Sequence, residues 1–234
     1  MARTHRGGAG KAAGVIRVRP AAVLFDMDGL LLDTERLIRD AMIAVMADMG
    51  FGLSHADFAE LVGRPETDSR GIVQARFGAA FDYDVMRAGV QQRIHAQHGP
   101  RRPLKPGSAA LLAQLNDAGI VCAVVTSTRS DTARSHLFHA GLLGGFATIV
   151  GGNDVANGKP HPEPYLAAAA RLKLVPADCL ALEDSHNGVI SAHAAGVPVI
   201  MVPDLLPPTA EISARTLAVA SDLETVAAWL AAAG

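Results

Sequence analysis

Two carboxylates follow a short apolar run near the beginning of the sequence and could perform chemistry together. Asp26 and Asp28 stand two residues apart directly after residues 22–25, AVLF, and Gly29 comes next. Side chains two apart on an extended chain point the same way, so both carboxylates can project into one space at the end of a buried strand. Gly29 allows the backbone to turn sharply and to approach a ligand closely. An acidic turn after the strand is the plainer alternative, because Asp and Gly are common turn residues.

Three later stretches place further reactive groups after apolar runs or in a loop. Thr126 and Ser127 lie in VVTST, Lys159 lies in the loop sequence NGKPHPEP, and Glu183 and Asp184 end LALED. A hydroxyl with a backbone N–H could hold a phosphoryl oxygen, a lysine could neutralise it, and the acids could hold a metal ion. Each stretch also has a plainer explanation, since Thr, Ser and acidic residues cap helices and a loop lysine is usually solvated.

Taken in order, these four stretches resemble the four motifs of the haloacid dehalogenase superfamily of aspartate-nucleophile phosphotransferases. DMDGLLLDTE resembles the first motif, VVTST the second, GKPHPEPY the third and LEDSHNG the fourth. The resemblance runs from about residue 21 to the C-terminus. It implies a helical-cap phosphatase or a protein of the β-phosphoglucomutase-like branch.

The resemblance implies a role for the residues of these motifs. Asp26 is expected to attack phosphorus, and Asp28 is expected to protonate the leaving oxygen and then activate water. The expected catalytic residues are Asp26, Asp28, Thr126 and Lys159. The expected cofactor is Mg²⁺, and its expected ligands are Asp26, Asp28 through its backbone carbonyl, Asp184, and Glu183 as a supporting or alternative ligand. The expected substrate contacts are Gly29, Leu30, Ser127, Gly63 and Arg64.

Beyond residue 105 the sequence alternates apolar runs with segments of helical length. The runs at 120–125, 147–150, 179–182 and 198–202 predict strands, and the segments at 108–118, 131–139, 163–173 and 186–195 predict helices. Such alternation is typical of βαβ units. We therefore expect an α/β fold, with a Rossmann-like parallel sheet and helices on both faces. In such sheets ligands bind at the carboxyl ends of the strands, where the four motifs fall.

The residues between the first strand and this alternation have a different pattern. Helices are expected at 34–49, capped by Asp33 or Thr34, and at 66–77 and 82–97, while Ser54 and Asp57 resemble a capping box. We expect a small all-helical domain inserted after the first strand, which in the family is a mobile cap. The expected division is a disordered tail at 1–19, a core domain at 20–36 and 103–234, and a cap domain at 37–102.

The composition favours a globular protein of the cytoplasm. The chain has 234 residues, half of them hydrophobic, and a net charge of −2, so no strong field favours nucleic acid or a membrane surface. Cys122 and Cys179 both lie in apolar runs and are expected to be reduced core residues. No apolar run is long enough to span a membrane. The expected partner is a small phosphorylated metabolite, and the sequence leaves the oligomeric state open.

The function expected from these features is a Mg²⁺-dependent phosphatase that acts on a sugar phosphate or a nucleoside monophosphate. The dehalogenase branch is disfavoured by Asp28, since a leaving halide needs no proton. A phosphonoacetaldehyde hydrolase needs a cap lysine, and no lysine lies between Lys11 and Lys105. A hexose-phosphate mutase remains the main alternative, although Glu66 stands where its pattern has a basic residue. A silent binding protein is the third hypothesis.

Overall fold

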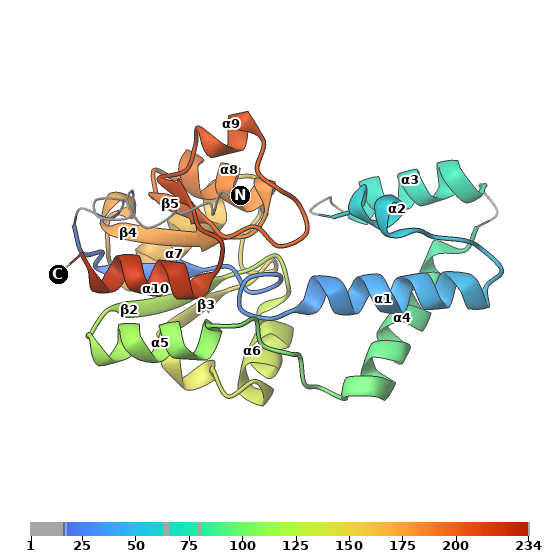
Figure 1. The fold of residues 1–234 in the computed structure, drawn as a ribbon, viewed down its shortest axis with the longest axis horizontal. Helices are drawn as coiled ribbons and strands as arrows, with labels where there is room; N and C mark the ends of the chain where they lie inside the picture. Colours follow the sequence, from blue (N-terminus) through green and yellow to red (C-terminus); the bar gives the residue numbers. More distant parts are fainter. Residues whose placement is uncertain (1–15, 17, 63–65, 79–80, 234) are drawn as a thin grey trace, which may run out of the picture.

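The computed structural model describes residues 16, 18–62, 66–78 and 81–233. A six-stranded parallel sheet in the order β3-β2-β1-β4-β5-β6 forms the centre of the larger part of the molecule (Figure 1). The strands are β1 Ala22–Phe25, β2 Val121–Val125, β3 Thr148–Val150, β4 Cys179–Glu183, β5 Val199–Met201 and β6 Ala218–Val219. The predicted α/β fold class is confirmed.

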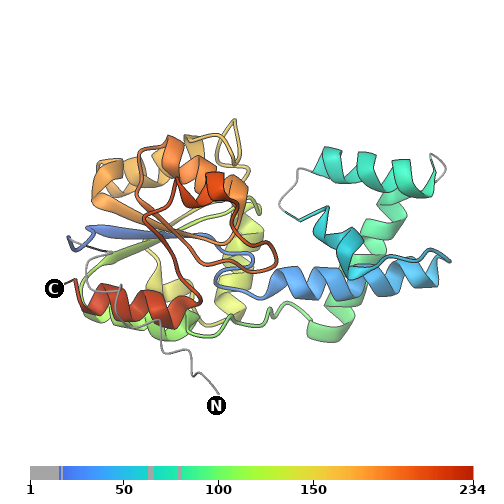
Figure 2. The same ribbon diagram turned by 45° about the horizontal axis from the view of Figure 1, so that its top comes forward.

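Helices cover both faces of this sheet, as Figure 2 shows. Apolar residues of α5, α6 and α10 pack on one face, and those of α7, α8 and α9 pack on the other. These helices are α5 Ser108–Asp117, α6 Ser130–His139, α7 Glu163–Leu172, α8 His186–Ala194, α9 Ala210–Ser213 and α10 Leu223–Ala231. Two short 3₁₀ turns, η1 Leu143–Gly145 and η2 Pro176–Asp178, precede β3 and β4.

The central strand β1 explains why both faces need helices. Val23 and Phe25 pack with one apolar cluster and Ala22 and Leu24 with the other, because successive side chains of a strand point to opposite faces. All four are fully buried, which is typical of a strand inside a parallel sheet. Phe25 pairs with a residue of β2 on one side and of β4 on the other. The three strands therefore end at the same level, next to one another.

Four helices between β1 and α5 form a separate apolar cluster beyond the carboxyl edge of the sheet (Figure 1). They are α1 Thr34–Asp48, α2 His55–Ala59, α3 Glu66–Phe77 and α4 Tyr83–His98. The rings of Phe51, Phe77 and Phe81 pack together with centroids 5.0–5.7 Å apart. The predicted capping box is present, since Ser54 and Asp57 hydrogen-bond each other's backbone N–H at the start of α2.

Two expectations about the elements need correction. Asp33 does precede α1, but its carboxylate makes no capping hydrogen bond and instead pairs with Arg36 at 2.9 Å. The alternation does not end at β5, since α9, β6 and α10 follow it. The two-residue strand β6 is too short to produce a recognisable apolar run. None of the helices in the described ranges is long and apolar enough to cross a membrane.

Candidate active site

The strands β1, β2 and β4 end at a cavity of about 540 Å³. It is lined by six of the residues expected from the sequence, namely Asp26, Asp28, Thr126, Ser127, Lys159 and Asp184. Gly29, Leu30 and Glu183 are buried and are not among the described residues that line this cavity. Gly63 and Arg64, the expected contacts from the helical insert, lie outside the described residues. The topology thus gathers side chains that are up to 158 positions apart in the sequence, from Asp26 to Asp184.

A buried lysine connects two of the acids. The Lys159 ammonium donates hydrogen bonds to Asp26 Oδ1 at 2.5 Å, to Glu183 Oε1 at 2.5 Å and to the Val125 carbonyl at 2.8 Å. Only 5% of the Lys159 side chain is exposed, so the lysine is not the solvated loop residue of the plainer explanation. The hydroxyl of Tyr165 donates to the same Glu183 oxygen at 2.5 Å. Ionic partners within a dry site interact more strongly than they would in water.

The pKa shifts of Lys159 and Asp26 follow from their burial and from the excess of carboxylates over ammonium groups around them. Burial disfavours the charged ammonium of Lys159, but the carboxylates of Asp26 and Glu183 outweigh that effect and raise its pKa. Burial raises the pKa of Asp26 well above its usual range, and the Glu183 charge adds to this while Lys159 opposes it. One cation therefore does not neutralise all the acids that surround it.

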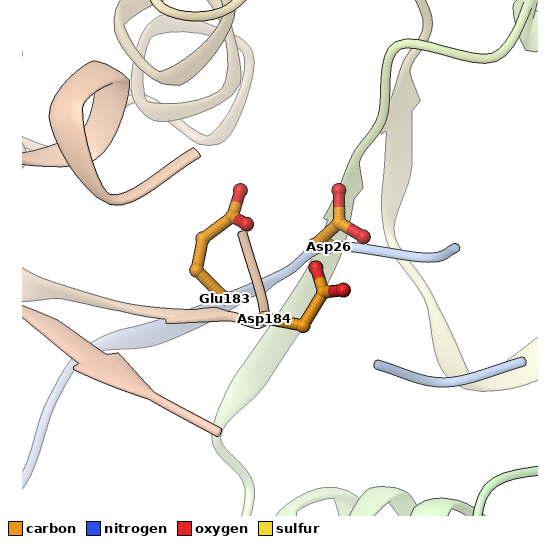
Figure 3. Close-up of side chains that lie close together, drawn as sticks. All are labelled: Asp26, Glu183 and Asp184. Atoms are coloured by element: carbon orange, nitrogen blue, oxygen red, sulfur yellow. The ribbon is translucent and has the colours of Figure 1, made fainter. Parts of the chain in front are cut away.

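Three carboxylates form a cluster that could hold a metal ion. Oxygen atoms of Asp26, Glu183 and Asp184 lie within 4.8 Å of one another (Figure 3). Burial, followed by the charges of Asp26 and Glu183, raises the pKa of Asp184 well above its usual range. A divalent cation would relieve this repulsion, and a donor set made only of carboxylate oxygens suits a hard ion such as Mg²⁺. The residues present therefore fit a hard divalent cation.

The carboxylate of Asp28 is surrounded by hydroxyl groups. Thr34 Oγ1 donates to Asp28 Oδ1 at 2.9 Å, while Thr128 Oγ1 and Thr126 Oγ1 donate to Oδ2 at 2.7 and 3.3 Å. The metal-competent cluster of the described residues does not include Asp28. The two acids of the first motif thus have different environments, one among charges and the other among neutral donors.

Two glycines let the backbone come close to the acids. Gly29 has a φ of +86°, and a Cβ there would lie 2.1 Å from Asp184 Oδ2. Gly188 lies in the first turn of α8, where a Cβ would lie 1.9 Å from the carboxyl carbon of Glu183. Side chains at these positions would occupy the space that the two carboxylates need.

Helix capping does not account for the polar residues at the strand ends. Arg129 precedes α6 and provides no side-chain cap, so neither Thr126 nor Ser127 caps that helix. Ser185, not Asp184, precedes α8, and its hydroxyl accepts a hydrogen bond from the Gly188 N–H. The capping explanation is therefore wrong for Thr126 and Asp184.

The backbone N–H groups after Asp28 are not equivalent. The N–H of Gly29 donates to the Leu32 carbonyl at 2.9 Å. No backbone hydrogen bond of the Leu30 N–H occurs among the described residues. The Leu30 N–H thus has no backbone acceptor to exchange, whereas the Gly29 N–H has one, but neither residue is among the described residues that line the cavity. The predicted role of Gly29 as a donor stays a prediction.

The structure adds three residues that the sequence interpretation missed. Thr128 donates to Asp28, and Tyr165 donates to Glu183. Glu35, in the first turn of α1, lines the cavity, and its pKa is raised to about 7 by burial and by the charges of Asp28 and Asp204. A signal was present for two of them, because Glu35 directly follows the DT of the first motif and Tyr165 ends GKPHPEPY.

With this geometry in view, comparison with known proteins identifies the family. The chain belongs to the haloacid dehalogenase-like hydrolase family, whose sequence model matches residues 23–202. The protein is therefore an enzyme of the hydrolase class, and the resemblance read from the four motifs is confirmed.

Three similar proteins illustrate the range of the family. The bifunctional riboflavin kinase/FMN phosphatase of Arabidopsis thaliana is 31% identical over 186 residues, which are 79% of this chain. Those residues are 49% of that protein, so the chain spans about half its length. The (DL)-glycerol-3-phosphatase 2 of Arabidopsis thaliana is 33% identical over 211 residues, 84% of this chain and 83% of that protein. The crystal structure of CbbY from Rhodobacter sphaeroides in complex with phosphate has a TM-score of 0.71 at 28% identity, covering 87% of this chain and 95% of that one.

The close approach of Gly188 to Glu183 predicts that one added methyl group lowers the stability of the fold strongly. Gly188→Ala should destabilise the fold by about 3 kcal/mol, because the overlap is with a fully buried carboxylate that cannot move away. Urea denaturation measures this. Gly71→Ala in α3 is the matched control, since nothing lies within 4 Å of its Cβ position. That control should raise stability by up to about 1 kcal/mol. Equal effects of the two substitutions would contradict the packing at Gly188.

The raised pKa of Glu35 predicts a pH-dependent stability in chelator. Between its ordinary value of 4.5 and about 7, the folded protein holds a proton that the unfolded chain has lost. The free energy of unfolding should therefore fall as pH rises through this window, by at most about 3 kcal/mol from this group. Glu35→Gln removes the contribution, so its stability relative to wild type should grow from pH 4.5 to 7.5. Denaturation curves with the exposed Glu224→Gln as control test this, and a pH-independent difference would refute it.

Proposed function

We propose that this enzyme is a Mg²⁺-dependent phosphatase that hydrolyses a small phosphorylated metabolite through an aspartyl-phosphate. The observation that carries the proposal is the different environment of the two acids of the first motif. Asp26 lies among charged groups and pairs with Lys159. Asp28 accepts hydrogen bonds from hydroxyl groups, and among the described residues no cation lies within 4.0 Å of it. Two carboxylates with separate environments can perform nucleophilic and acid–base roles.

In the first step, Asp26 attacks phosphorus and the bond to the leaving oxygen breaks. Lys159 holds Asp26 Oδ1, so the other carboxylate oxygen is free of protein donors among the described residues and can act as the nucleophile. Asp28 gives its proton to the leaving alkoxide. Lys159 stabilises the charge on the phosphoryl oxygens, and the Thr126 hydroxyl would do so once it exchanges its present acceptor, Asp28, for a phosphoryl oxygen.

In the second step, water replaces the leaving alcohol. Asp28, now ionised, takes a proton from this water, and the resulting nucleophile attacks the phosphorus of the aspartyl-phosphate. Inorganic phosphate leaves and Asp26 is restored. Thr34 and Thr128 hold the Asp28 carboxylate in place for both proton transfers.

The metal site proposed for Mg²⁺ uses the carboxylates of Asp26 and Asp184 and the backbone carbonyl of Asp28. When bound, the ion neutralises charge on the phosphoryl group and on the two acids. Glu183 already accepts hydrogen bonds from Lys159 and Tyr165, so we propose that it positions the lysine and does not serve as a direct ligand.

The proposed substrate site lies between the sheet and the four helices α1–α4. We propose that these helices are a cap domain, 37–102, that closes on the core formed by 20–36 and 103–234. Their separate apolar cluster supports this division, although residue 37 lies within α1. The proposed phosphoryl contacts are Gly29, Leu30 and Ser127, and the proposed cap contacts are Gly63 and Arg64.

Relatives named as an FMN phosphatase and a glycerol-3-phosphatase support a small phosphate monoester as the substrate. We propose a sugar phosphate or a nucleoside monophosphate, turned over in the cytoplasm, where the free thiols of Cys122 and Cys179 would stay reduced. A silent binding protein is disfavoured, because the chain retains the acids and the lysine that the chemistry needs.

A hexose-phosphate mutase is disfavoured by the state of two cap arginines, Arg70 and Arg76, although Arg64 could still supply positive charge. Such an enzyme must hold the distal phosphate of a bisphosphorylated intermediate. Arg70 is paired with Asp84 at 2.6 Å, and Arg76 is paired with Asp57. These two guanidinium groups are already engaged within the cap, so water should win the competition for the aspartyl-phosphate.

The roles assigned to Asp26 and Asp28 predict different losses of activity when each is replaced by asparagine. Asp26→Asn should abolish turnover and phosphoenzyme formation with the fold intact, because an amide is not a nucleophile here. Asp28→Asn should slow turnover by about 10²-fold or more, because the leaving group loses its proton donor. Release of inorganic phosphate measures both, and turnover retained by Asp26→Asn would exclude it as nucleophile.

The metal proposal predicts loss of activity in chelator. EDTA should abolish phosphate release, and Mg²⁺ should restore it. Asp184→Ala should raise the Mg²⁺ concentration needed for half-maximal rate sharply, because one of the two ligand carboxylates is lost. Full activity in excess EDTA would overturn the metal scheme.

If water, and not a sugar hydroxyl, attacks the aspartyl-phosphate, the product is inorganic phosphate. With β-glucose 1-phosphate and its 1,6-bisphosphate, inorganic phosphate should form faster than glucose 6-phosphate. No bisphosphate should be needed for turnover of a small monophosphate. A coupled assay for glucose 6-phosphate beside a phosphate assay decides this, and the reverse order of rates would favour the mutase.

A further inference from the structure

A second, smaller chamber opens on the other side of the proposed acid–base residue. Its volume is about 190 Å³, and it lies between α1, α4, α6 and the linker from α4 to α5, which passes α6 in Figure 1. This is room for about six water molecules at ~30 Å³ each. The chamber shares Asp28, Ile38 and Thr128 with the main cavity, so the two spaces meet at the residue that faces the leaving oxygen.

Among the described residues, the guanidinium group of Arg102, which lines this chamber, has no carboxylate partner. Arg102 Nη1 donates to the carbonyls of Gly99 and Arg101 at 3.0 and 2.8 Å, which fixes one edge of the group. Across residues 18–62, 66–78 and 81–233, Nε and Nη2 make no hydrogen bond, and no carboxylate lies within 4.0 Å of the group. Burial lowers the pKa of Arg102 and the Asp28 charge opposes that shift, but arginine remains charged at any working pH.

A histidine with an unsatisfied atom lies on the same wall. The Nδ1 of His136 is buried and has no hydrogen-bond partner among the described residues. Burial and the Arg102 charge lower the pKa of this imidazole. Thr132, one turn earlier on α6, and Gln91 of α4 add a hydroxyl and an amide to the lining.

These groups share a preference for a negatively charged ligand. Of the described residues that line the chamber, Asp28 is the one acid, and its carboxylate already accepts three hydroxyl hydrogen bonds. The remaining N–H donors of Arg102 match the planar geometry of a carboxylate or one edge of a phosphate. An anion would also offer Nδ1 of His136 a hydrogen-bond partner when that atom carries the proton, and it would offset the positive charge of Arg102 beside it.

We propose that this chamber is a subsite for a second anionic group of the substrate, a carboxylate or phosphate, held by Arg102 and His136. The proposal rests on the phosphatase function. Within the small phosphorylated metabolites, it favours short phosphate monoesters that carry a further anion near the ester oxygen over a sugar phosphate or a nucleoside monophosphate without one. Asp28 stands at the junction of the two cavities, so such a group can enter the chamber while the ester oxygen remains beside Asp28.

A matched pair of esters tests the subsite. The probes are 2-phosphoglycolate and 2-hydroxyethyl phosphate, which differ by a carboxylate against a neutral hydroxymethyl group. We expect wild-type kcat/KM to favour the anionic ester by tenfold or more, and Arg102→Gln to reduce that ratio by at least tenfold. Arg101→Gln, an exposed neighbour outside the chamber, is the control and should leave both rates within twofold. Equal kcat/KM for both esters in wild type would overturn the subsite.

Binding without turnover separates failure of the subsite from failure of the phosphatase function. If wild type releases no phosphate from these two esters or from a panel of sugar phosphates and nucleoside monophosphates, the proposed function is wrong, and the subsite is judged by calorimetry on Asp26→Asn. That variant should bind 2-phosphoglycolate at least tenfold more tightly than 2-hydroxyethyl phosphate, and adding Arg102→Gln should remove the difference. Equal dissociation constants would refute the subsite. Glycolate alone binding as tightly as 2-phosphoglycolate would show a site for a free anion and refute the assignment to the substrate.

Histidine NMR provides a readout that does not depend on how Arg102→Gln folds. In Asp26→Asn, the imidazole signals of His136, assigned with His136→Gln, should shift with 2-phosphoglycolate and not with 2-hydroxyethyl phosphate. His139 lies on the same helix outside the chamber and should stay unchanged with both ligands. A His136 spectrum that does not respond to 2-phosphoglycolate would contradict the proposal.

Discussion

The shared positive charge of Lys159 is the interaction on which the rest of this site depends. Asp26, Glu183 and Asp184 are all buried at one edge of the sheet, where their charges repel and are poorly solvated. The ammonium group bonds two of them at 2.5 Å and is itself held by the Val125 carbonyl. Removing one partner of such a buried pair costs about 3–5 kcal/mol in comparable proteins. The site is therefore stable only as a set, and it retains an excess of negative charge that suits a divalent cation.

The parallel sheet explains why this set can exist. Equal register of β1 with its two neighbours brings their carboxyl ends to one level, and each strand is followed immediately by a polar residue. Glycine at positions 29 and 188 leaves room for two carboxylates against the backbone. The helical insert leaves and rejoins the core beside the same edge, so it adds Ile38 and Val62 to the cavity lining without interrupting the sheet (Figure 2). The proposed division of labour between nucleophile and acid thus follows from topology as much as from residue type.

Much of this arrangement could be predicted from the sequence, because its signals are local. Buried strands appear as apolar runs, and the residues at their ends belong to short motifs with fixed order. Contacts between distant segments were not predictable in this way. Nothing in VVTST indicates that Thr128, rather than Thr126, makes the shorter bond to Asp28. Glu183 accepts hydrogen bonds from Lys159 and Tyr165, which belong to another segment of the sequence. The strand β6 was not predictable from the sequence, because two residues are too few to show a periodic pattern.

In the proposed mechanism, Asp26 is a phosphoryl acceptor that depends on Lys159 and a divalent cation. Beryllium fluoride can occupy the place of a phosphoryl group on such a carboxylate, so ¹⁹F NMR tests the claim without knowledge of the substrate. Wild-type protein with Mg²⁺ should give resonances of a bound beryllium trifluoride. They should disappear in EDTA and in Asp26→Asn, and weaken strongly in Lys159→Met. Bound resonances that persist in Asp26→Asn would contradict the assignment of Asp26 as the acceptor.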